Sequence, residues 1–220
     1  MVRRDKKAVL IIYTIIFYGV WTIFERFGRD FIDKNIESAF ISQIVKSGVI
    51  KNLIWTLPAV LLIHHFKSDV YITLKEMVST KVEWLKYLPV FAIFTVWILM
   101  GSILQNGKLE IASSFGMNEV IIVAFVGLTE EMVFRGWLLN ATIRENKKWA
   151  AILLNALLFL IIHFPIWIHK GVFLSSFADF SFLGIIALSI IFSLTFIKSK
   201  NILIPIALHM YWDLLMFMFF

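Results

Sequence analysis

The chain has 220 residues, of which 60% are hydrophobic, and its mean hydropathy is +0.85. Soluble domains are about 45–50% apolar, so this composition excludes an ordinary water-soluble core and predicts a single integral membrane domain over residues 1–220. Cysteine is absent, which excludes disulfides, thiolate metal sites and a cysteine nucleophile. The formal charge of +6 does not predict nucleic-acid binding, because the basic residues lie in short segments between apolar runs.

Apolar runs long enough to cross a bilayer recur along the chain, since a spanning helix needs about 20 mostly apolar residues. They predict an all-α, polytopic transmembrane helix bundle of about seven spans, in a range of about six to eight. The predicted spans are residues 8–24, 49–66, 87–104, 118–142, 150–168, 182–197 and 202–220. The second is the weakest, because it is interrupted or flanked by Lys51, Pro58, His64 and His65. Segments 31–47 and 68–85 are mixed in polarity and are expected in the membrane interface or on the bundle.

The lysines and arginines predict how the bundle lies in the membrane, since these residues are enriched in cytoplasmic loops. The N-terminal segment is basic, and so are the loops at 67–86, 143–149 and 198–201, whereas the loops at 105–117 and 169–181 hold one lysine each. The abundance of Ile, Phe and Lys is typical of an AT-rich bacterial genome. We therefore expect a multi-pass protein of a bacterial cell membrane with a cytoplasmic N-terminus and an external C-terminus.

Ionisable groups inside a bilayer are costly and usually face the interior of a helix bundle. We therefore expect the few polar side chains of the spans 118–142, 150–168 and 202–220 to form one site in the bundle core. These side chains are Glu130, Glu131, Arg135, Asn155, His163, His209 and Asp213.

The first group lies in the span 118–142. Glu131 and Arg135 are four residues apart and meet on one helix face, so they are predicted to neutralise each other. Glu130 is rotated by about 100° from Glu131 and has no local partner. We therefore interpret Glu131 as structural and Glu130 as the free carboxylate that a general base requires. The alternative is a buried structural ion network.

The other polar residues lie in the last spans. His163 alone fits a hydrogen bond between helices as well as catalysis, and Asn155 is expected to link helices. His209 and Asp213 share a face, where Asp213 can hold the imidazole in one tautomer, or the two can simply fix helix packing. At 1.5 Å per residue, Glu130, His163 and Asp213 are predicted within about one helical turn of the same depth, with His209 about one turn closer to the cytoplasm.

Three short motifs thus occur in order, each in a predicted span: Glu130-Glu131 with Arg135, Phe159 with His163, and His209 with Asp213. This pattern resembles the CAAX protease and bacteriocin-processing family, also called the Abi family, which includes the type 2 CAAX prenyl endopeptidases. The resemblance covers about residues 118–216, taken as the catalytic core. It implies an intramembrane endopeptidase that hydrolyses a peptide bond with activated water.

The resemblance also implies a role for each matching residue. Glu130 would be the general base that activates water, and His163 would help to bind and orient that water. His209, together with the residue at position 213, would form the oxyanion-stabilising side of the site. Glu131 and Arg135 would support these residues.

Asp213 departs from the type 2 prenyl endopeptidases, which have Asn at the matching position. An ionised aspartate cannot donate a hydrogen bond to an oxyanion as asparagine does. Two interpretations therefore remain: Asp213 keeps the ring of His209 a cationic donor, or Asp213 is itself protonated.

No metal cofactor is expected. Glu130, His163, His209 and Asp213 are residue types that can hold zinc, which is the alternative. However, two histidines and two carboxylates would fill a tetrahedral site and leave no position for water, and the sequence has no HExxH helix.

The expected partners are the lipid bilayer and a peptide or protein substrate, not nucleic acid, and the oligomeric state is left open. A short secreted or membrane-associated peptide is the preferred substrate, because protein prenylation is not expected in bacteria. The main alternative is a non-catalytic membrane adaptor or bacteriocin self-immunity protein of the same fold. A transporter with a proton relay is a further alternative, although the sequence shows no internal repeat.

Overall fold

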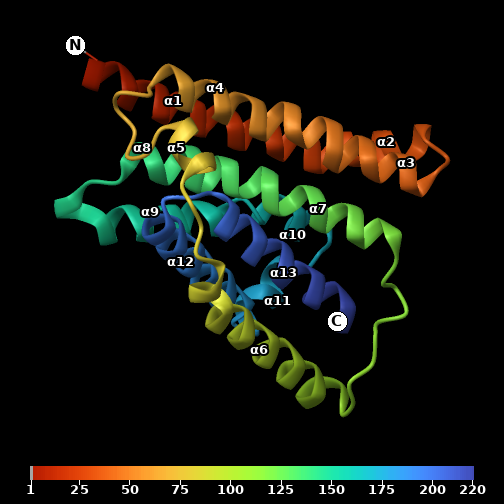
Figure 1. Ribbon diagram of the computed structural model, residues 1–220. Helices are drawn as coiled ribbons and strands as arrows, with labels where there is room; N and C mark the ends of the chain where they lie inside the picture. Colours follow the sequence, from red (N-terminus) through yellow and green to blue (C-terminus); the bar gives the residue numbers. More distant parts are fainter. Residues whose placement is uncertain (1) are drawn as a thin grey trace.

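The computed structural model describes residues 2–220, and in that range it contains helices, turns and loops but no strand (Figure 1). Five helical stretches have the length and apolar composition to cross a membrane: Asp5–Asn35, Ala39–His65, Trp84–Asn106, Glu145–His169 and Ser181–Ser199. A shorter apolar helix, α13 (Leu203–Phe219), follows them. The predicted all-α, polytopic helix bundle is confirmed.

The first two stretches form a hairpin of long helices. The first consists of α1 (Val2–Ile23), the π-helical segment η1 (Phe24–Gly28) and α2 (Arg29–Asn35). The second consists of α3 (Ala39–Gln43), the π-helical segments η2 (Ile44–Ile50) and η3 (Asn52–Thr56), and α4 (Leu57–His65). The two helices pack against each other and run in opposite directions (Figure 1).

Residues 31–47 form the tip of this hairpin, where the interfacial segment expected from the sequence stays a prediction. The polar side chains that suggested such a segment pair with one another. The ammonium of Lys46 lies 2.6 Å from Oδ1 of Asp33, and the hydroxyl of Ser42 also donates to Asp33. These contacts join the end of the first long helix, at Asn35, to the start of the second, at Ala39.

The other mixed segment, 68–85, packs on the bundle. It contains the short helix α5 (Leu74–Ser79), in which Met77 is fully buried. The backbone oxygen of Met77 accepts a 2.8 Å hydrogen bond from the N–H of Ile202, next to the start of α13. The 3-10 turn η4 (Trp84–Tyr87) then leads into α6 (Leu88–Asn106).

The fourth predicted span, 118–142, is a continuous helix that carries the carboxylates. It consists of α7 (Met117–Glu131), the π-helical segment η5 (Met132–Leu139) and α8 (Asn140–Thr142). Its middle holds Glu130, Glu131 and Arg135, so this charged helix is not among the five stretches above, although its apolar residues predicted a span. π-Helical segments are uncommon and occur frequently at functional sites.

The remaining elements are η6 (Glu145–Lys147), α9 (Lys148–Ile161), α10 (Phe164–His169), α11 (Phe173–Ala178) and α12 (Ser181–Ser199). α12 packs along α9, and α13 packs along α7. Gly127 permits the second contact, because a Cβ there would lie 2.5 Å from Cγ of Met210 and 3.2 Å from the backbone oxygen of Ile206. This close approach brings the last turn of α7 against the middle of α13.

The basic segments of the chain meet at one end of the bundle. Lys6 donates to the backbone oxygen of Asp69, and the N–H of Tyr71 donates to the backbone oxygen of Asn140 at 3.0 Å. The N-terminus lies at this end, and the C-terminus lies at the other (Figure 1). The basic segments thus lie at the same end of the bundle, as the lysines and arginines predicted. The assignment of this end to the cytoplasm stays a prediction.

Candidate active site

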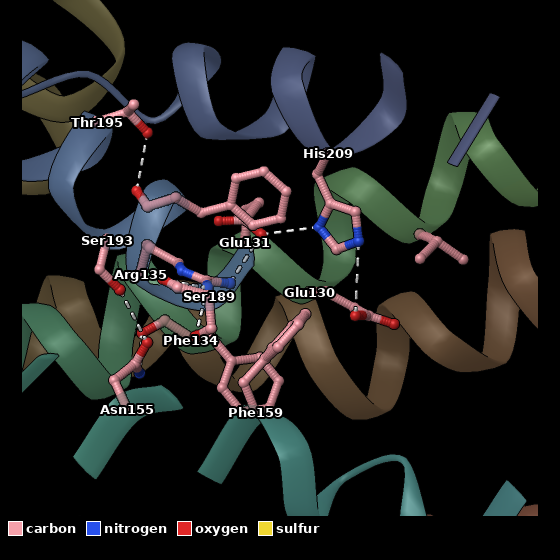
Figure 2. A network of polar contacts seen from close by, with 12 residues as sticks. Glu130, Glu131, Phe134, Arg135, Asn155, Phe159, Ser189, Ser193, Thr195 and His209 are labelled. Atoms are coloured by element: carbon pink, nitrogen blue, oxygen red, sulfur yellow. Dashed lines mark hydrogen bonds and ion pairs between the residues drawn. The ribbon is translucent and has the colours of Figure 1, made fainter. Parts of the chain in front are cut away.

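The candidate site lies where the last turn of α7 faces α13 (Figure 2). Glu130 and Glu131 end α7, and they point toward different partners because neighbouring helical residues are rotated by about 100°. Glu131 has no exposed surface, whereas Glu130 is 8% exposed. Of these two carboxylates, Glu130 is therefore the one that can meet a water molecule.

Glu131 is the centre of a buried polar network. Its Oε1 atom accepts a hydrogen bond from a guanidinium nitrogen of Arg135 at 2.8 Å and another from Nδ1 of His209 at 2.8 Å. The predicted pair of Glu131 and Arg135 is therefore present. Because an ionised carboxylate only accepts hydrogen bonds, Nδ1 of His209 carries a proton. The other ring nitrogen, Nε2, faces Glu130 (Figure 2).

Arg135 ties this network to a third helix. Its guanidinium donates to the backbone oxygen and the hydroxyl of Ser189 on α12, at 3.0 and 2.7 Å. The guanidinium also lies over the rings of Phe159 and Phe192, 4.6 and 5.2 Å from their centroids. The ring of Phe192 in turn stacks on His209 at 4.9 Å. Cation, carboxylate and imidazole are thus held rigidly by α7, α9, α12 and α13.

His209 takes its orientation from Glu131 rather than from Asp213. The sequence placed His209 and Asp213 on one face, and Oδ2 of Asp213 does lie 3.5 Å from the ring, but beside Nε2. The nitrogen that is held by a short hydrogen bond is Nδ1, and its partner is Glu131. The prediction that Asp213 fixes the tautomer therefore differs from the structure, in which Asp213 is placed to support a positive charge on the ring.

Glu130 has a partner that sequence reasoning missed. The ammonium of Lys51, on the second long helix, lies 2.8 Å from Oε1 of Glu130, and both side chains are buried. The ammonium also lies over the rings of Trp55 and Trp21, at 4.5 and 5.5 Å from their centroids. The prediction of an unpaired Glu130 is therefore wrong. The available signal was Lys51 itself, because a lysine within an apolar span requires a partner.

The second oxygen of Glu130 has no such partner. Oε2 lies 3.9 Å from Nε2 of His209, which is beyond hydrogen-bond distance. The same Nε2 atom lies 3.5 Å from Asp213. Two carboxylates therefore face one imidazole nitrogen without bonding it directly, as is expected at a place that a water molecule or a substrate carbonyl occupies.

His163 lies between α9 and α10, within the helical stretch Glu145–His169 that corresponds to the predicted span 150–168. Its Nδ1 atom is 2.8 Å from the backbone oxygen of Phe159. A carbonyl only accepts, so Nδ1 carries the proton and Nε2 can accept a hydrogen bond from water. His163 lies within electrostatic range of Glu130, and both His163 and His209 pack against the ring of Phe159.

Asn155 links helices, as predicted. Its amide nitrogen donates to the backbone oxygen of Phe134 at 2.8 Å, and its amide oxygen accepts from the hydroxyl of Ser193 at 3.4 Å. The residue therefore joins α9 to η5 and α12 (Figure 2). Among residues 2–220, Asn155 makes no hydrogen bond to Glu130, His163 or His209. Its role is to support the helices that carry the site.

A cavity of about 70 Å³ lies on the Lys51 side of the site. Its lining includes polar side chains from both helices of the hairpin, among them Arg29, Gln43, Ser47 and Lys51. A polar cavity of this size has room for water. It therefore offers a place from which water can reach the Lys51–Glu130 pair.

The described residues 2–220 contain no group of three or more His, Asp or Glu side chains placed to hold a metal ion. The position next to Oε1 of Glu130, which a cation would occupy, is taken by the ammonium of Lys51. Glu131 is likewise engaged by Arg135 and His209. Glu130 thus already has a cationic partner, and a metal-free site stays a prediction.

Fold and site together define a polytopic helical membrane protein with a buried centre of carboxylates and imidazoles. Residues 112–215 match the family described as type II CAAX prenyl endopeptidase Rce1-like. The predicted resemblance to the CAAX protease family is confirmed, and at the level of the family the match supports a membrane protease. No curated protein and no solved structure matches the chain.

Proposed function

We propose that the protein is an intramembrane endopeptidase in which Glu130 activates the attacking water. The observation that carries the proposal is the contrast between the two adjacent carboxylates. Glu131 is fully buried and bonded to Arg135 and His209, whereas Glu130 is slightly exposed and, among the described residues, keeps one oxygen without a hydrogen bond and with two imidazoles nearby. One carboxylate thus supports the site, and the other is available for chemistry.

Lys51 makes an ionised Glu130 compatible with the bundle. A buried carboxylate requires a compensating charge, and the ammonium at 2.8 Å from Oε1 supplies it. Oε2 then remains to accept a proton from water. In the proposed reaction, a water held between Glu130 and Nε2 of His163 loses a proton to Oε2 and attacks the peptide carbonyl carbon.

His209 is proposed to stabilise the oxyanion that forms. With Nδ1 held by Glu131, a protonated Nε2 is a fixed donor on the side of Glu130, and the nearby carboxylate of Asp213 supports the cationic ring. A preorganised donor of this kind contributes about 3–4 kcal/mol to stabilising the transition state. Collapse of the tetrahedral intermediate breaks the C–N bond, and the proton taken by Glu130 passes to the leaving amine.

The proposed mechanism uses no metal, since Lys51 provides the positive charge that zinc would bring to Glu130. Protein that keeps its activity after exhaustive chelation agrees with this. Loss of activity that zinc alone restores contradicts it.

A short secreted or membrane-associated peptide is the proposed substrate. The experiment compares peptides released from bacterial membranes that contain the wild-type protein, Glu130→Gln or Glu110→Gln. Glu110 is an exposed loop residue paired with Lys108, so its substitution is a matched control. Products that require Glu130 but not Glu110 support the peptidase. An unchanged peptide pattern and phenotype in correctly inserted Glu130→Gln protein would favour an adaptor or self-immunity protein.

A further inference from the structure

Two neighbouring cavities lie between α1 and the start of α9, away from the candidate active site. The first is an apolar groove of about 240 Å³ on the membrane-facing side. Its lining comes from α1, η5, α8 and α9 and includes Leu10, Ile15, Leu138 and Leu158.

The few polar side chains in this groove are already bonded within the protein. Thr14 donates to the backbone oxygen of Leu10, and Thr142 donates to that of Leu138. Asn155 is bonded to Phe134 and Ser193. A molecule in the groove therefore meets hydrocarbon, and an apolar chain fits it better than a polar one.

The second cavity, of about 340 Å³, lies at the end of the bundle where the N-terminus is found. Lys6 and Lys7 line it from α1, and Arg144 and Lys147 line it from the loop between α8 and α9. Among the side chains that the structure describes, which begin at residue 5, no acidic one belongs to its lining. Its charge is therefore complementary to an anion.

The two cavities adjoin, because Leu10, Thr142 and Leu154 line both of them. Trp149, next to the basic cavity at the start of α9, is 60% exposed. Exposed tryptophans are typical of the membrane–water interface. The basic cavity thus lies at the depth of lipid headgroups, and the apolar groove extends from it into the hydrocarbon.

We propose that this composite site binds an anionic phospholipid, with the headgroup phosphate among Lys6, Lys7, Arg144 and Lys147 and one acyl chain in the groove between α1 and α9. Basic pockets between membrane helices recognise anionic headgroups. A free phosphate would use only the basic cavity and would leave the groove unexplained. The proposal does not depend on the proposed peptidase activity.

The test uses delipidated full-length protein in detergent and measures bound lipid by native mass spectrometry. Phosphatidylglycerol and phosphatidylcholine of the same chain lengths are compared, with inorganic phosphate as the competitor. We expect phosphatidylglycerol to bind in preference to phosphatidylcholine. Each neutralised basic residue near the headgroup weakens binding about five-fold, so Arg144→Gln/Lys147→Gln should weaken it about 30-fold.

The matched control is Lys108→Gln/Lys170→Gln, which removes two lysines from the loops at the opposite end and should leave lipid binding unchanged. Leu154→Trp fills the region shared by both cavities and should weaken phosphatidylglycerol binding without affecting phosphate. Equal binding of the two lipids to the wild-type protein overturns the proposal. So does phosphatidylglycerol binding that Leu154→Trp does not change but inorganic phosphate abolishes, because that result defines a site for free anions.

Discussion

The ammonium of Lys51 lies 2.8 Å from Oε1 of Glu130, although the two residues are 79 positions apart in the sequence. Lys51 lies outside the matched segment 112–215, whereas Glu130 lies inside it. The N-terminal hairpin therefore contributes a charged side chain to the site as well as apolar surface to the bundle.

The first prediction concerns this ion pair. Lys51→Met keeps most of the side-chain volume but leaves the carboxylate of Glu130 buried without its partner, so it should destabilise the protein by about 3–5 kcal/mol. Lys51→Met/Glu130→Gln should recover part of this loss, because the uncompensated charge is then absent. Thermal unfolding of the purified proteins in detergent measures both effects, with Lys51→Arg as the charge-preserving control. Strictly additive losses would show that the two groups do not interact.

The second prediction concerns the carboxylate that orients His209. Glu131→Gln removes the charge that holds Arg135 and the protonated Nδ1 atom of His209, so peptide release should fall by at least about 100-fold. The measurement is the rate at which the Glu130-dependent products appear, normalised to folded protein. Glu110→Gln is the control for a lost carboxylate on the surface. Wild-type rates in Glu131→Gln would remove Glu131 from the proposed mechanism.

The third prediction separates two roles of Asp213. Asp213→Asn preserves the shape and adds a hydrogen-bond donor, whereas Asp213→Ala removes the polar group beside Nε2 of His209. We expect Asp213→Asn to retain activity to within about ten-fold, because the amide can itself donate to the oxyanion. Asp213→Ala should lose about 100-fold or more, because it leaves neither a charge nor a donor beside Nε2. The same product assay distinguishes them. Wild-type activity in both variants would remove Asp213 from the proposed mechanism, whereas equal large losses would mean that its charge is required.

The fourth prediction concerns the contact between α7 and α13. A Cβ at Gly127 would lie 2.5 Å from Met210, so Gly127→Ala should force the helices apart and destabilise the protein by about 1–3 kcal/mol. The same displacement should separate His209 from Glu131 and lower activity. A Cβ at Gly19 on α1 would meet no neighbouring atom within 4 Å, so Gly19→Ala should be neutral or slightly stabilising. Thermal unfolding of both variants tests the difference, and a neutral Gly127→Ala would contradict the close packing.

Much of the fold followed from the sequence because membrane spans are read from local composition. The polar residues were informative for the same reason, since few of them occur in the apolar spans. The pair of Glu131 and Arg135 was predictable because its spacing of four residues lies within one helix. Depth counting predicted Glu130, His163 and Asp213 at similar depth, but it did not predict which side chains face one another.

The partners of Glu130 and His209 were not predictable from local spacing. Lys51 and Glu130 meet across the bundle, and in the sequence Lys51 only lowered the apolar character of its span. His209 has Asp213 at the favourable spacing, yet Glu131 on α7 makes the shorter hydrogen bond because Gly127 lets α7 and α13 approach closely. Such contacts depend on how the helices pack against one another, and the spacing of residues along one sequence does not reveal this packing.

Lys51 lies on a long, uninterrupted helix, so the position of its ammonium beside Glu130 depends on the register of that helix. Inserting or deleting one residue between Ala39 and Lys51 would rotate the ammonium by about 100° around the helix axis and turn it from Glu130 toward another face. The lipid-facing residues in the first half of the chain can therefore vary widely. The number of residues that precede Lys51 on its helix cannot change without separating its ammonium from Glu130.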